Sequence, residues 1–447
     1  MDLEQYFNKK IELEIKQDHR SIKYSGILTN LTKKQGIRTY YFLKLNSGYN
    51  IGIDSHTIKS VKLLKAEKES IIHKKVQEIE KDDSKPIISL LHFGGTIASK
   101  VDYKTGAVIA EFSPEDLISM FPELKDIANI ESEFIGNLWS QDLRFEHYNI
   151  LAKQIEKEIK KGVKGIIVAQ GTDTLHYTSA ALSFMLKNCP VPVILVGSQR
   201  SSDRGSTDAA LNLIDATYFI ANSDFAGVAV CMHNSSSDDY CAIIPGTRAR
   251  KMHSTRRDSF KTINANPYAL VDFNNAFDKI VYVNKDYPKY NENAKFIVKY
   301  FDPKLKIAVI KQHTHMFAEE FLLYKDYDAI VIESTGLGNL PISEMDDATK
   351  EHSKIFNVLS EIIKRGTIIV LSPQTIFGRL NLNVYENARR QQEIGILGDN
   401  NDMTTETTFI KLAWLLSNYD NETTKELIMK NLRGELSDHI GYKKDFV

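Results

Sequence analysis

The sequence predicts an α/β protein with two halves built on mainly parallel sheets, preceded by a small all-β barrel domain. From Pro86 onward, short apolar segments alternate with amphipathic stretches of helical spacing, a pattern typical of parallel strands covered by helices. The first 63 residues instead contain short segments of alternating polarity, which favour antiparallel strands. A densely charged stretch, residues 64–85, separates these two parts. We therefore expect domains at 1–63, 86–285 and 305–447, with a linker at 64–85 and a connector at 286–304.

The β domain is predicted from the alternation of its polar and apolar residues. The alternation covers residues 11–15, 21–27, 40–45 and 49–53, and Asn46-Ser47-Gly48 is a typical hairpin turn. Short strands with polar turns favour a small barrel. Because residues 1–63 contain no acid–base cluster and no glycine-rich anion loop, we expect them to serve in interaction or scaffolding. The linker carries charges of both signs, as solvated connectors do.

The two α/β halves are predicted from apolar segments that alternate with helical patterns. We expect strands at residues 87–91, 165–169, 191–196, 227–232, 306–310, 329–332 and 367–371. We expect helices at residues 148–161, 175–186, 208–221 and 352–364. The polar region 262–304 has neither pattern and is interpreted as a long crossover between the halves.

The composition is that of an ordinary globular protein and excludes several functional classes. Of the 447 residues, 42% are hydrophobic and 26% are charged, and the formal net charge is −1. This charge gives no general attraction to nucleic acid. Cys189, Cys231 and Cys241 lack metal-binding spacing, so we expect inert thiols in a reducing compartment. No apolar run approaches ~18 residues and the N-terminus lacks a signal-like segment, so we expect a cytoplasmic protein without membrane contact.

The stretch Leu91–Ser99 carries the first candidate for chemistry. The apolar strand 87–91 is followed by Gly94-Gly95 and then at once by Thr96. Two glycines let the backbone turn sharply and approach a ligand closely, and ligands of α/β sheets bind at the carboxyl ends of strands. Thr96 is therefore a candidate nucleophile. The alternative is an ordinary turn in which Thr96 caps a helix.

A second strand exit carries the strongest polar cluster of the sequence. The apolar strand 165–169 runs into Gln170-Gly171-Thr172-Asp173-Thr174. Asp173 stands at the start of a predicted helix, where the helix dipole stabilises a negative charge. Two hydroxyls and a carboxylate exceed what helix capping requires, although capping by Thr172 or Asp173 is the alternative.

Two further polar segments follow. The loop 197–204 is again led by a glycine, and residues 248–257 form a basic run, which is usually a solvated face. One lysine of this run could still enter a site, because a threonine hydroxyl needs a positioned base before it can attack an amide. A lysine whose pKa is lowered by desolvation, oriented by an aspartate, is a suitable proton acceptor.

The residues therefore indicate an acyl-transfer enzyme with a threonine nucleophile and without metal or nucleotide. Neither the GxxxxGK[ST] nor the GxGxxG pattern of phosphate-binding loops occurs. His313 and His315 are weak metal candidates because no third ligand accompanies them.

These motifs resemble those of the bacterial-type L-asparaginase family. Residues 94–98 look like its first signature and residues 171–174 like its second. Residues 140–142 (SQD) look like its substrate-clamping segment, and residues 101–108 look like its mobile lid with a tyrosine. The resemblance runs from about residue 86 to the C-terminus, with both signatures in the right order. It implies two asparaginase-like α/β domains, with the nucleophile in the first and oligomer contacts that help to complete the site.

The resemblance also implies a role for each matching residue. Thr96 would attack the side-chain amide carbon of the substrate, and Thr172 would act with Lys251 and Asp173 as a relay. The substrate-binding residues would be Tyr103, which closes over the site, and Ser140, Gln141 and Asp173, which hold the α-carboxylate and α-amino groups. An acyl-enzyme ester would form, ammonia would leave, and water would release the acid. Backbone N–H groups after the glycines are natural oxyanion donors.

The β domain looks like part of a narrower family. Residues 41–53 resemble the N-terminal barrel of the D subunit of the archaeal glutamyl-tRNA(Gln) amidotransferases, and the loops 197–204, 208–213 and 248–258 also look like that protein. In that family the asparaginase-like D subunit hydrolyses an amide donor, L-glutamine or L-asparagine, and the ammonia travels to the E subunit. The E subunit activates glutamate on misacylated tRNA with ATP and Mg²⁺, and the product is glutaminyl-tRNA(Gln).

This narrower resemblance implies a set of partners. We expect a heterotetramer of two D and two E subunits around a homodimer of this chain, with tRNA bound mainly through the partner. We expect no cofactor in this chain, since ATP and Mg²⁺ belong to the partner. Gln170 stands where the second signature usually has His, and Phe93 stands where a Thr usually precedes the glycine pair. These departures spare the catalytic positions and bear on substrate preference.

Two other functions stay open on the sequence alone. A free-standing cytoplasmic L-asparaginase would share the chemistry without an RNA partner, but it does not need the appended β domain. A non-catalytic scaffold could share the fold, but retention of Thr96, Thr172, Asp173 and Lys251 together argues against it.

Overall fold

The computed structural model describes residues 3–17, 20–45, 50–64, 82–93, 99–101, 108–110, 121–200, 206–275, 279–439 and 441. Thr96, Tyr103 and most of the linker predicted at 64–85 lie outside these residues. Among the helices that are described, none combines the length and the apolar character needed to span a membrane.

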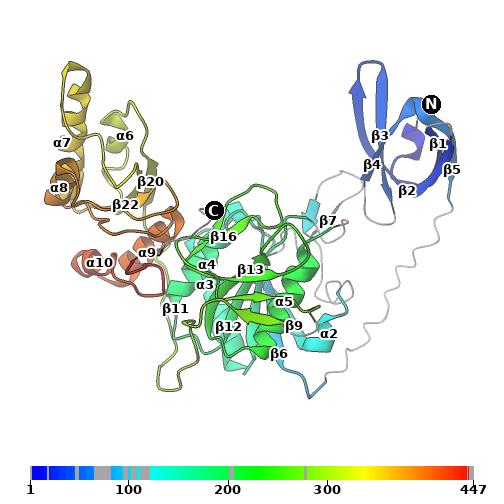
Figure 1. Ribbon diagram of the computed structural model, residues 1–447, viewed down its shortest axis with the longest axis horizontal. Helices are drawn as coiled ribbons and strands as arrows, with labels where there is room; N and C mark the ends of the chain where they lie inside the picture. The colour runs from blue at the N-terminus through cyan, green and yellow to red at the C-terminus, as the bar shows by residue number, and fades with distance from the viewer. Residues whose placement is uncertain are drawn as a thin grey trace.

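The N-terminal part forms a five-stranded antiparallel sheet with its own core (Figure 1). The strand order is β4-β3-β2-β1-β5, and the elements are η1 (Glu4–Tyr6), β1 (Lys10–Gln17), β2 (Arg20–Gln35), β3 (Arg38–Leu45), β4 (Asn50–Asp54), η2 (Ser55–Thr57) and β5 (Ile58–Leu63). Ile11, Leu13 and Ile15 alternate along β1 and are buried, as the period of two predicts. The sheet fits the small β domain that the sequence predicts. The sequence missed β5 and the full length of β2, whose register with β3 shifts between Leu28 and Thr32.

The next part is built on an eight-stranded sheet of order β18-β17-β14-β13-β12-β10-β6-β9. Its strands are β6 (Ile87–His92), β9 (Asn129–Phe134), β10 (Gly165–Ala169), β12 (Pro192–Val196), β13 (Gly227–His233), β14 (Cys241–Pro245), β17 (Ala269–Val271) and β18 (Ile280–Tyr282). The strands from β9 to β13 are parallel, as predicted. The remaining three strands pair antiparallel with their neighbours. The prediction that residues 262–304 are a crossover without strands is therefore wrong, since β17 and β18 extend the sheet.

Helices cover the two faces of this sheet (Figure 1). They are α2 (Leu124–Ile127), α3 (Phe145–Lys160), α4 (Leu175–Met185) and α5 (Ala209–Asn222). Ile166 and Val168 of β10 belong to the same core as α3 and α4, whereas Ile167 and Ala169 belong to the core that contains α5. Successive residues of β10 thus face opposite helical layers, which explains why the strand is apolar throughout.

The C-terminal part contains a three-stranded parallel sheet made of β20 (Ile307–Lys311), β21 (Ala329–Ser334) and β22 (Ile368–Pro373). Its helices are α6 (Glu319–Leu322), η5 (Asp347–Thr349), α7 (Lys350–Lys364), α8 (Glu386–Glu393), α9 (Thr405–Asn418) and α10 (Asn421–Leu427). Helix α9 joins this part to the preceding one, because Trp414 stacks on Phe184 of α4 with ring centroids 5.7 Å apart.

Short elements complete the described chain. They are η4 (Ser140–Asp142) and the two-stranded pairs of β7 (Ser99–Val101) with β8 (Val108–Ala110), β11 (Leu186–Lys187) with β19 (Ile297–Val298), and β15 (Ala249–Lys251) with β16 (Phe260–Thr262). The last of these pairs carries Lys251, one of the site residues that the sequence predicts.

Candidate active site

The turn that follows β10 presents Thr172 and Asp173 at the carboxyl end of the sheet. Gly171 packs closely against Ser140 there, because a Cβ atom at this position would lie 3.0 Å from Ser140 Oγ. Thr174 Oγ1 donates a 2.6 Å hydrogen bond to the backbone carbonyl of Ser140. The turn and the 140–142 segment are thus held together.

Lys251 connects the two functional groups of this turn. Its Nζ donates to Thr172 Oγ1 at 2.8 Å and to Asp173 Oδ1 at 2.7 Å. The lysine side chain is 10% exposed, whereas that of Asp173 is 67% exposed. The ammonium group is therefore enclosed between a buried hydroxyl and a carboxylate that solvent and ligands can reach.

Helix capping does not account for this turn. Helix α4 begins at Leu175, and its N-cap is Thr174, which makes no side-chain capping hydrogen bond. The hydroxyl of Thr172 is the partner of Lys251 instead. The capping interpretation of Thr172 and Asp173 thus fails, and both side chains are directed toward the lysine.

Gly197, at the exit of β12, fixes the side chain of Thr172. A Cβ atom on Gly197 would lie 2.7 Å from Thr172 Cγ2 and 3.1 Å from the carbonyl oxygen of Gln170. Only glycine leaves room for the threonine methyl group against this loop. A larger residue here would therefore displace the side chain whose hydroxyl bonds to Lys251. The sequence marks this glycine as the leader of a polar loop but gives no sign of its contact with Thr172.

Two arginines of the basic run anchor the strand that carries Lys251. Arg250 Nη1 lies 2.8 Å from Glu406 Oε2 at the start of α9. Arg248 is buried and ion-pairs with Asp402 at 3.2 Å. The prediction of a solvated face is therefore wrong for these two residues: they pair with acids that are more than 150 positions away.

A buried polar network holds the loop that begins at Gly197. The Asp208 carboxylate accepts hydrogen bonds from the backbone N–H groups of Gln199 at 2.9 Å and of Arg200 at 3.1 Å, and burial raises the pKa of Asp208. Asn212 Nδ2 donates to the carbonyl oxygen of Gly197 at 2.9 Å, and its Oδ1 lies 2.6 Å from His233 Nδ1. These contacts with the start of α5 hold the loop that begins at Gly197, which packs against Thr172.

Of the other predicted site residues, the structure describes Ser140 and Gln141. Ser140 is buried and Gln141 is exposed beside it. Thr96 and Tyr103 lie outside the described residues. Phe93, the last described residue before the first signature, is fixed at the sheet edge, because its N–H bonds to Ala169 O at 3.2 Å. The exit of β6 thus lies directly beside the exit of β10.

The structure also bears on the candidates for metal binding and on the cysteines. His313 Nε2 lies 3.0 Å from Glu320 Oε2. In the described part of the chain, no group of three or more His, Cys, Asp or Glu side chains is suited to hold a metal ion.

All three cysteines are free and buried, and burial raises the pKa of Cys189 to about 12. Burial of this kind is typical of unreactive structural thiols, which is what the sequence predicts.

Known proteins resemble the two α/β parts of this chain. Residues 87–282 match the family model "Asparaginase, N-terminal", and residues 306–429 match "Glutaminase/Asparaginase C-terminal domain". The L-asparaginase of Thermococcus kodakarensis is similar in structure, with a TM-score of 0.68 and 30% identity, over 79% of this chain and 100% of the other. L-asparaginase I of Vibrio cholerae has a TM-score of 0.67 and 25% identity, over 79% of this chain and 99% of the other.

Relatives of greater similarity extend over more of the chain. The D subunit of the glutamyl-tRNA(Gln) amidotransferase of Methanococcus maripaludis strain C7 is 40% identical over 89% of this chain and 92% of its own length. The D subunit of the Pyrococcus furiosus amidotransferase is 39% identical over 95% of this chain and 93% of its own length. With its asparaginase-like α/β fold, the chain therefore belongs to the family of glutamyl-tRNA(Gln) amidotransferase D subunits.

Proposed function

We propose that this chain is the ammonia-generating amidase subunit of a tRNA-dependent amidotransferase. It would hydrolyse the side-chain amide of L-glutamine or L-asparagine and deliver ammonia to a partner, the E subunit, for the conversion of Glu-tRNA(Gln) to Gln-tRNA(Gln). The observation that carries the amidase part is the contact of Lys251 Nζ with both Thr172 Oγ1 and Asp173 Oδ1.

The first chemical step is the formation of an ester on a threonine. The Oγ of Thr96 attacks the side-chain amide carbon, and the carbonyl becomes an oxyanion that backbone N–H groups stabilise. The proton lost by the attacking hydroxyl passes through the relay of Thr172, Lys251 and Asp173 to the amide nitrogen. The C–N bond then breaks, ammonia leaves, and the acyl group remains on the threonine.

The second step reverses the roles of the groups. A water molecule takes the place of ammonia, and the relay accepts one of its protons as the oxygen attacks the ester carbon. The ester bond breaks, the threonine hydroxyl is restored, and the acid is released. Lys251 suits both steps because its Nζ contacts Thr172 and Asp173: as a neutral amine it would take up a proton in each attack, and as an ammonium group it would return the proton to the leaving group.

Substrate binding would use the open side of the same turn. The carboxylate of Asp173 is exposed enough to pair with the α-ammonium group of the amide donor. Ser140 and Gln141 would hold the α-carboxylate group, and Tyr103 would close over the site. The hydrogen bond from Thr174 Oγ1 to the Ser140 carbonyl supports this assignment, because it ties the binding segment to the catalytic turn.

The length of the similarity favours an amidotransferase component over a free-standing L-asparaginase. The asparaginase of Thermococcus kodakarensis is matched along its whole length yet covers only 79% of this chain. The matched family models begin at residue 87, so the five-stranded sheet that precedes this residue needs another purpose. We propose that the complex contains two copies of this chain as a homodimer and two copies of the E subunit. ATP, Mg²⁺ and most of the tRNA contacts belong to the partner.

Conversion of Glu-tRNA(Gln) to Gln-tRNA(Gln) tests this function. The assay compares this chain alone with this chain co-expressed with an E-type partner, with glutamine or asparagine as the donor. Conversion only in the presence of the partner supports the amidotransferase function. No conversion, together with rapid asparagine hydrolysis by this chain alone, would favour the free-standing cytoplasmic asparaginase.

A further inference from the structure

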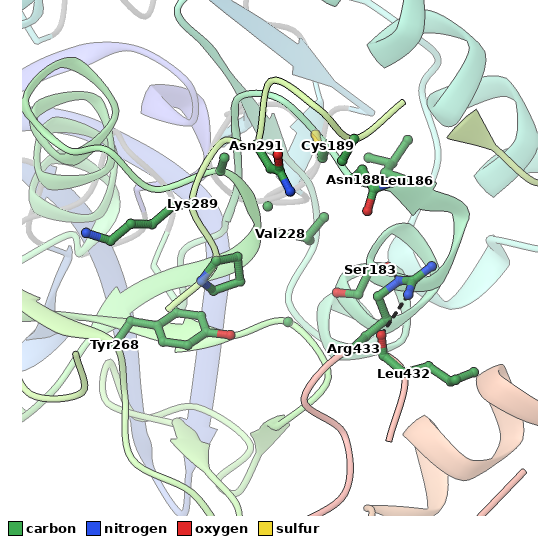
Figure 2. A pocket seen from close by; sticks show the side chains of 15 residues that line it. Ser183, Leu186, Asn188, Cys189, Val228, Tyr268, Lys289, Asn291, Leu432 and Arg433 are labelled. Atoms are coloured by element: carbon green, nitrogen blue, oxygen red, sulfur yellow. Dashed lines mark hydrogen bonds between the residues drawn. The ribbon is translucent and has the colours of Figure 1, made fainter. Parts of the chain in front are cut away.

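A cavity of about 360 Å³ is lined by residues that include Tyr268, Cys189 and Arg433 (Figure 2). Thr172 follows the carboxyl end of β10, whereas Cys189 and Gly227 of the cavity lining precede or begin the parallel strands β12 and β13. The amino and carboxyl ends of parallel strands lie at opposite edges of a sheet. The cavity is therefore separate from the turn that carries Thr172 and Asp173.

Arg433 brings to this cavity a guanidinium group that makes no direct ion pair among the described residues, although the charge of Glu435 acts on it. Its Nε donates to the carbonyl oxygen of Ser183 at 3.1 Å, and its Nη1 donates to that of Leu432 at 2.7 Å. The nearby acid, Glu435, is already paired with Lys411 at 2.7 Å, with both side chains fully buried. In the part of the chain that the structure describes, Arg433 forms no salt bridge. Burial lowers the pKa of its guanidinium group, which reflects the cost of removing this charge from water.

Tyr268 adds a neutral hydrogen-bond donor to the same cavity. Its ring is buried, and its hydroxyl points toward the space between Arg433 and Val228 (Figure 2). No hydrogen bond of this hydroxyl occurs among the described residues, whereas burial raises its pKa to about 12. The hydroxyl therefore keeps its proton at neutral pH and is free to donate it to a ligand.

The rest of the lining restricts the ligand further. Leu186, Val228 and Leu432 provide apolar walls, and no Asp or Glu side chain is among the described residues that line the cavity. An α-ammonium group would find no anionic partner there, so the lining disfavours zwitterionic amino acids such as the amide donor. The volume suits a small metabolite.

We propose that this cavity binds a small oxyanion, a carboxylate or a phosphate, through the guanidinium group of Arg433 and the hydroxyl of Tyr268. The geometry suits such a ligand because a guanidinium group binds carboxylate and phosphate oxygens through paired N–H donors. The site goes beyond the amidase chemistry proposed above and does not depend on it.

The segment that carries Arg433 also holds the strand of the candidate active site. Thr247 Oγ1 donates to the carbonyl oxygen of Arg433 at 3.3 Å, and Arg248 Nε donates to that of Gly434 at 2.9 Å. A bound anion would therefore stabilise this junction in the folded state, and thermal unfolding reports such binding.

Isothermal titration calorimetry on the full chain tests the site directly. Succinate and inorganic phosphate are the two probes, which separate a carboxylate ligand from a phosphate ligand, and L-glutamate is the zwitterionic comparison. We expect one of the two probes to bind and to raise Tm, with at least tenfold weaker binding of L-glutamate. Failure of both probes to bind at tens of millimolar would overturn the proposal.

Three variants assign the binding to its residues. We expect R433M to weaken anion binding at least tenfold. We expect Y268F, which keeps the ring and removes only the hydroxyl, to weaken it several-fold. K289M is the matched control: Lys289 also lines the cavity, but its Nζ pairs with Asp224 at 2.7 Å and points away from the space (Figure 2). Two results would contradict the proposal. In the first, both R433M and Y268F bind the anion as tightly as the wild type. In the second, K289M abolishes binding and Y268F leaves it unchanged.

Discussion

Lys251 Nζ donates a 2.8 Å hydrogen bond to Thr172 Oγ1 across 79 positions of the sequence. The same ammonium group lies 2.7 Å from Asp173 Oδ1. A hydroxyl and a carboxylate that are adjacent in the chain thus share one enclosed cation. Under the proposed function, proton transfer would accompany attack on the amide at this point of the fold.

Replacement of Lys251 by methionine should abolish most amide hydrolysis while the protein stays folded. We expect kcat to fall about 10²–10⁴-fold, the usual contribution of a positioned acid–base group. Stability should change little, because Asp173 is exposed and water can solvate its carboxylate. Ammonia release is the measurement, and Lys261→Met on the paired strand β16 is the control. Hydrolysis at the original rate in Lys251→Met would remove the lysine from the mechanism.

Replacement of Thr96 by valine tests the nucleophile itself. The swap is nearly isosteric and removes only the hydroxyl, so we expect no acyl-enzyme and no ammonia from glutamine or asparagine. Mass spectrometry of the protein mixed with the amide donor should detect an ester adduct only when Thr96 is present. Unchanged hydrolysis by Thr96→Val would mean that another group attacks the amide.

Gly197→Ala should lower both stability and activity, although the residue carries no functional group. The new Cβ would lie 2.7 Å from Thr172 Cγ2, so the threonine must move away from Lys251. Such overpacking costs about 1–3 kcal/mol, and a displacement of about 1 Å at a catalytic group can lower the rate about 10²-fold. Urea unfolding and ammonia release measure the two effects.

The control for this substitution is Gly136→Ala. A Cβ atom at Gly136 would meet Phe93 Cδ1 at an ordinary 3.8 Å, so neither stability nor rate should change much. Equal effects of the two substitutions would show that the contact between Gly197 and Thr172 has no special role.

The sequence predicted the strands that carry the site far better than it predicted the contacts around them. Residues 165–169 and 192–196 are buried, so the apolar character of these segments alone marks them as strands. Strands β17 and β18 have only three residues each, too few to display a period. The partners of Arg248 and Arg250 lie more than 150 positions away, so local charge could not distinguish a buried clamp from a solvated face.

The ion pair of Arg250 with Glu406 should support the position of Lys251. Removing the charge with Glu406→Gln should destabilise the protein by about 1–3 kcal/mol and lower the rate of amide hydrolysis, because Arg250 is the neighbour of Lys251 on β15. Glu361→Gln on α7, whose pair with Arg365 is exposed, should change stability by less than about 0.5 kcal/mol. If Glu406→Gln lost as little stability as Glu361→Gln, the ion pair of Arg250 with Glu406 would not be supporting the strand that carries Lys251.

The same pair predicts a loss of stability in acid. Burial opposes the ionisation of Glu406, but its contacts with His176 and Arg250 outweigh that effect and lower its pKa. The carboxylate therefore contributes stability above the ordinary glutamate value of about 4.3, and this contribution disappears as the pH falls through the lower pKa of the folded state. Urea unfolding of the wild type and Glu406→Gln should converge as the pH is lowered through this range.

Asp215 predicts the opposite dependence on pH. It is buried on α5, where burial raises its pKa to about 7, although its carboxylate accepts a hydrogen bond from the N–H of Phe273. Because the unfolded chain loses this proton near pH 3.9, the folded state binds more protons between about pH 4 and 7. The free energy of unfolding must then fall as the pH rises through this window, by up to roughly 4 kcal/mol, and level off above it.

The Asp215→Asn variant tests this dependence. It has no ionisable group at position 215, so its stability relative to the wild type should rise from pH 5 to pH 8. Urea unfolding at the two pH values measures this difference, with the exposed Asp326→Asn as the control. A wild-type protein and an Asp215→Asn variant with the same pH profile would mean that this carboxyl group titrates alike in the folded and unfolded states.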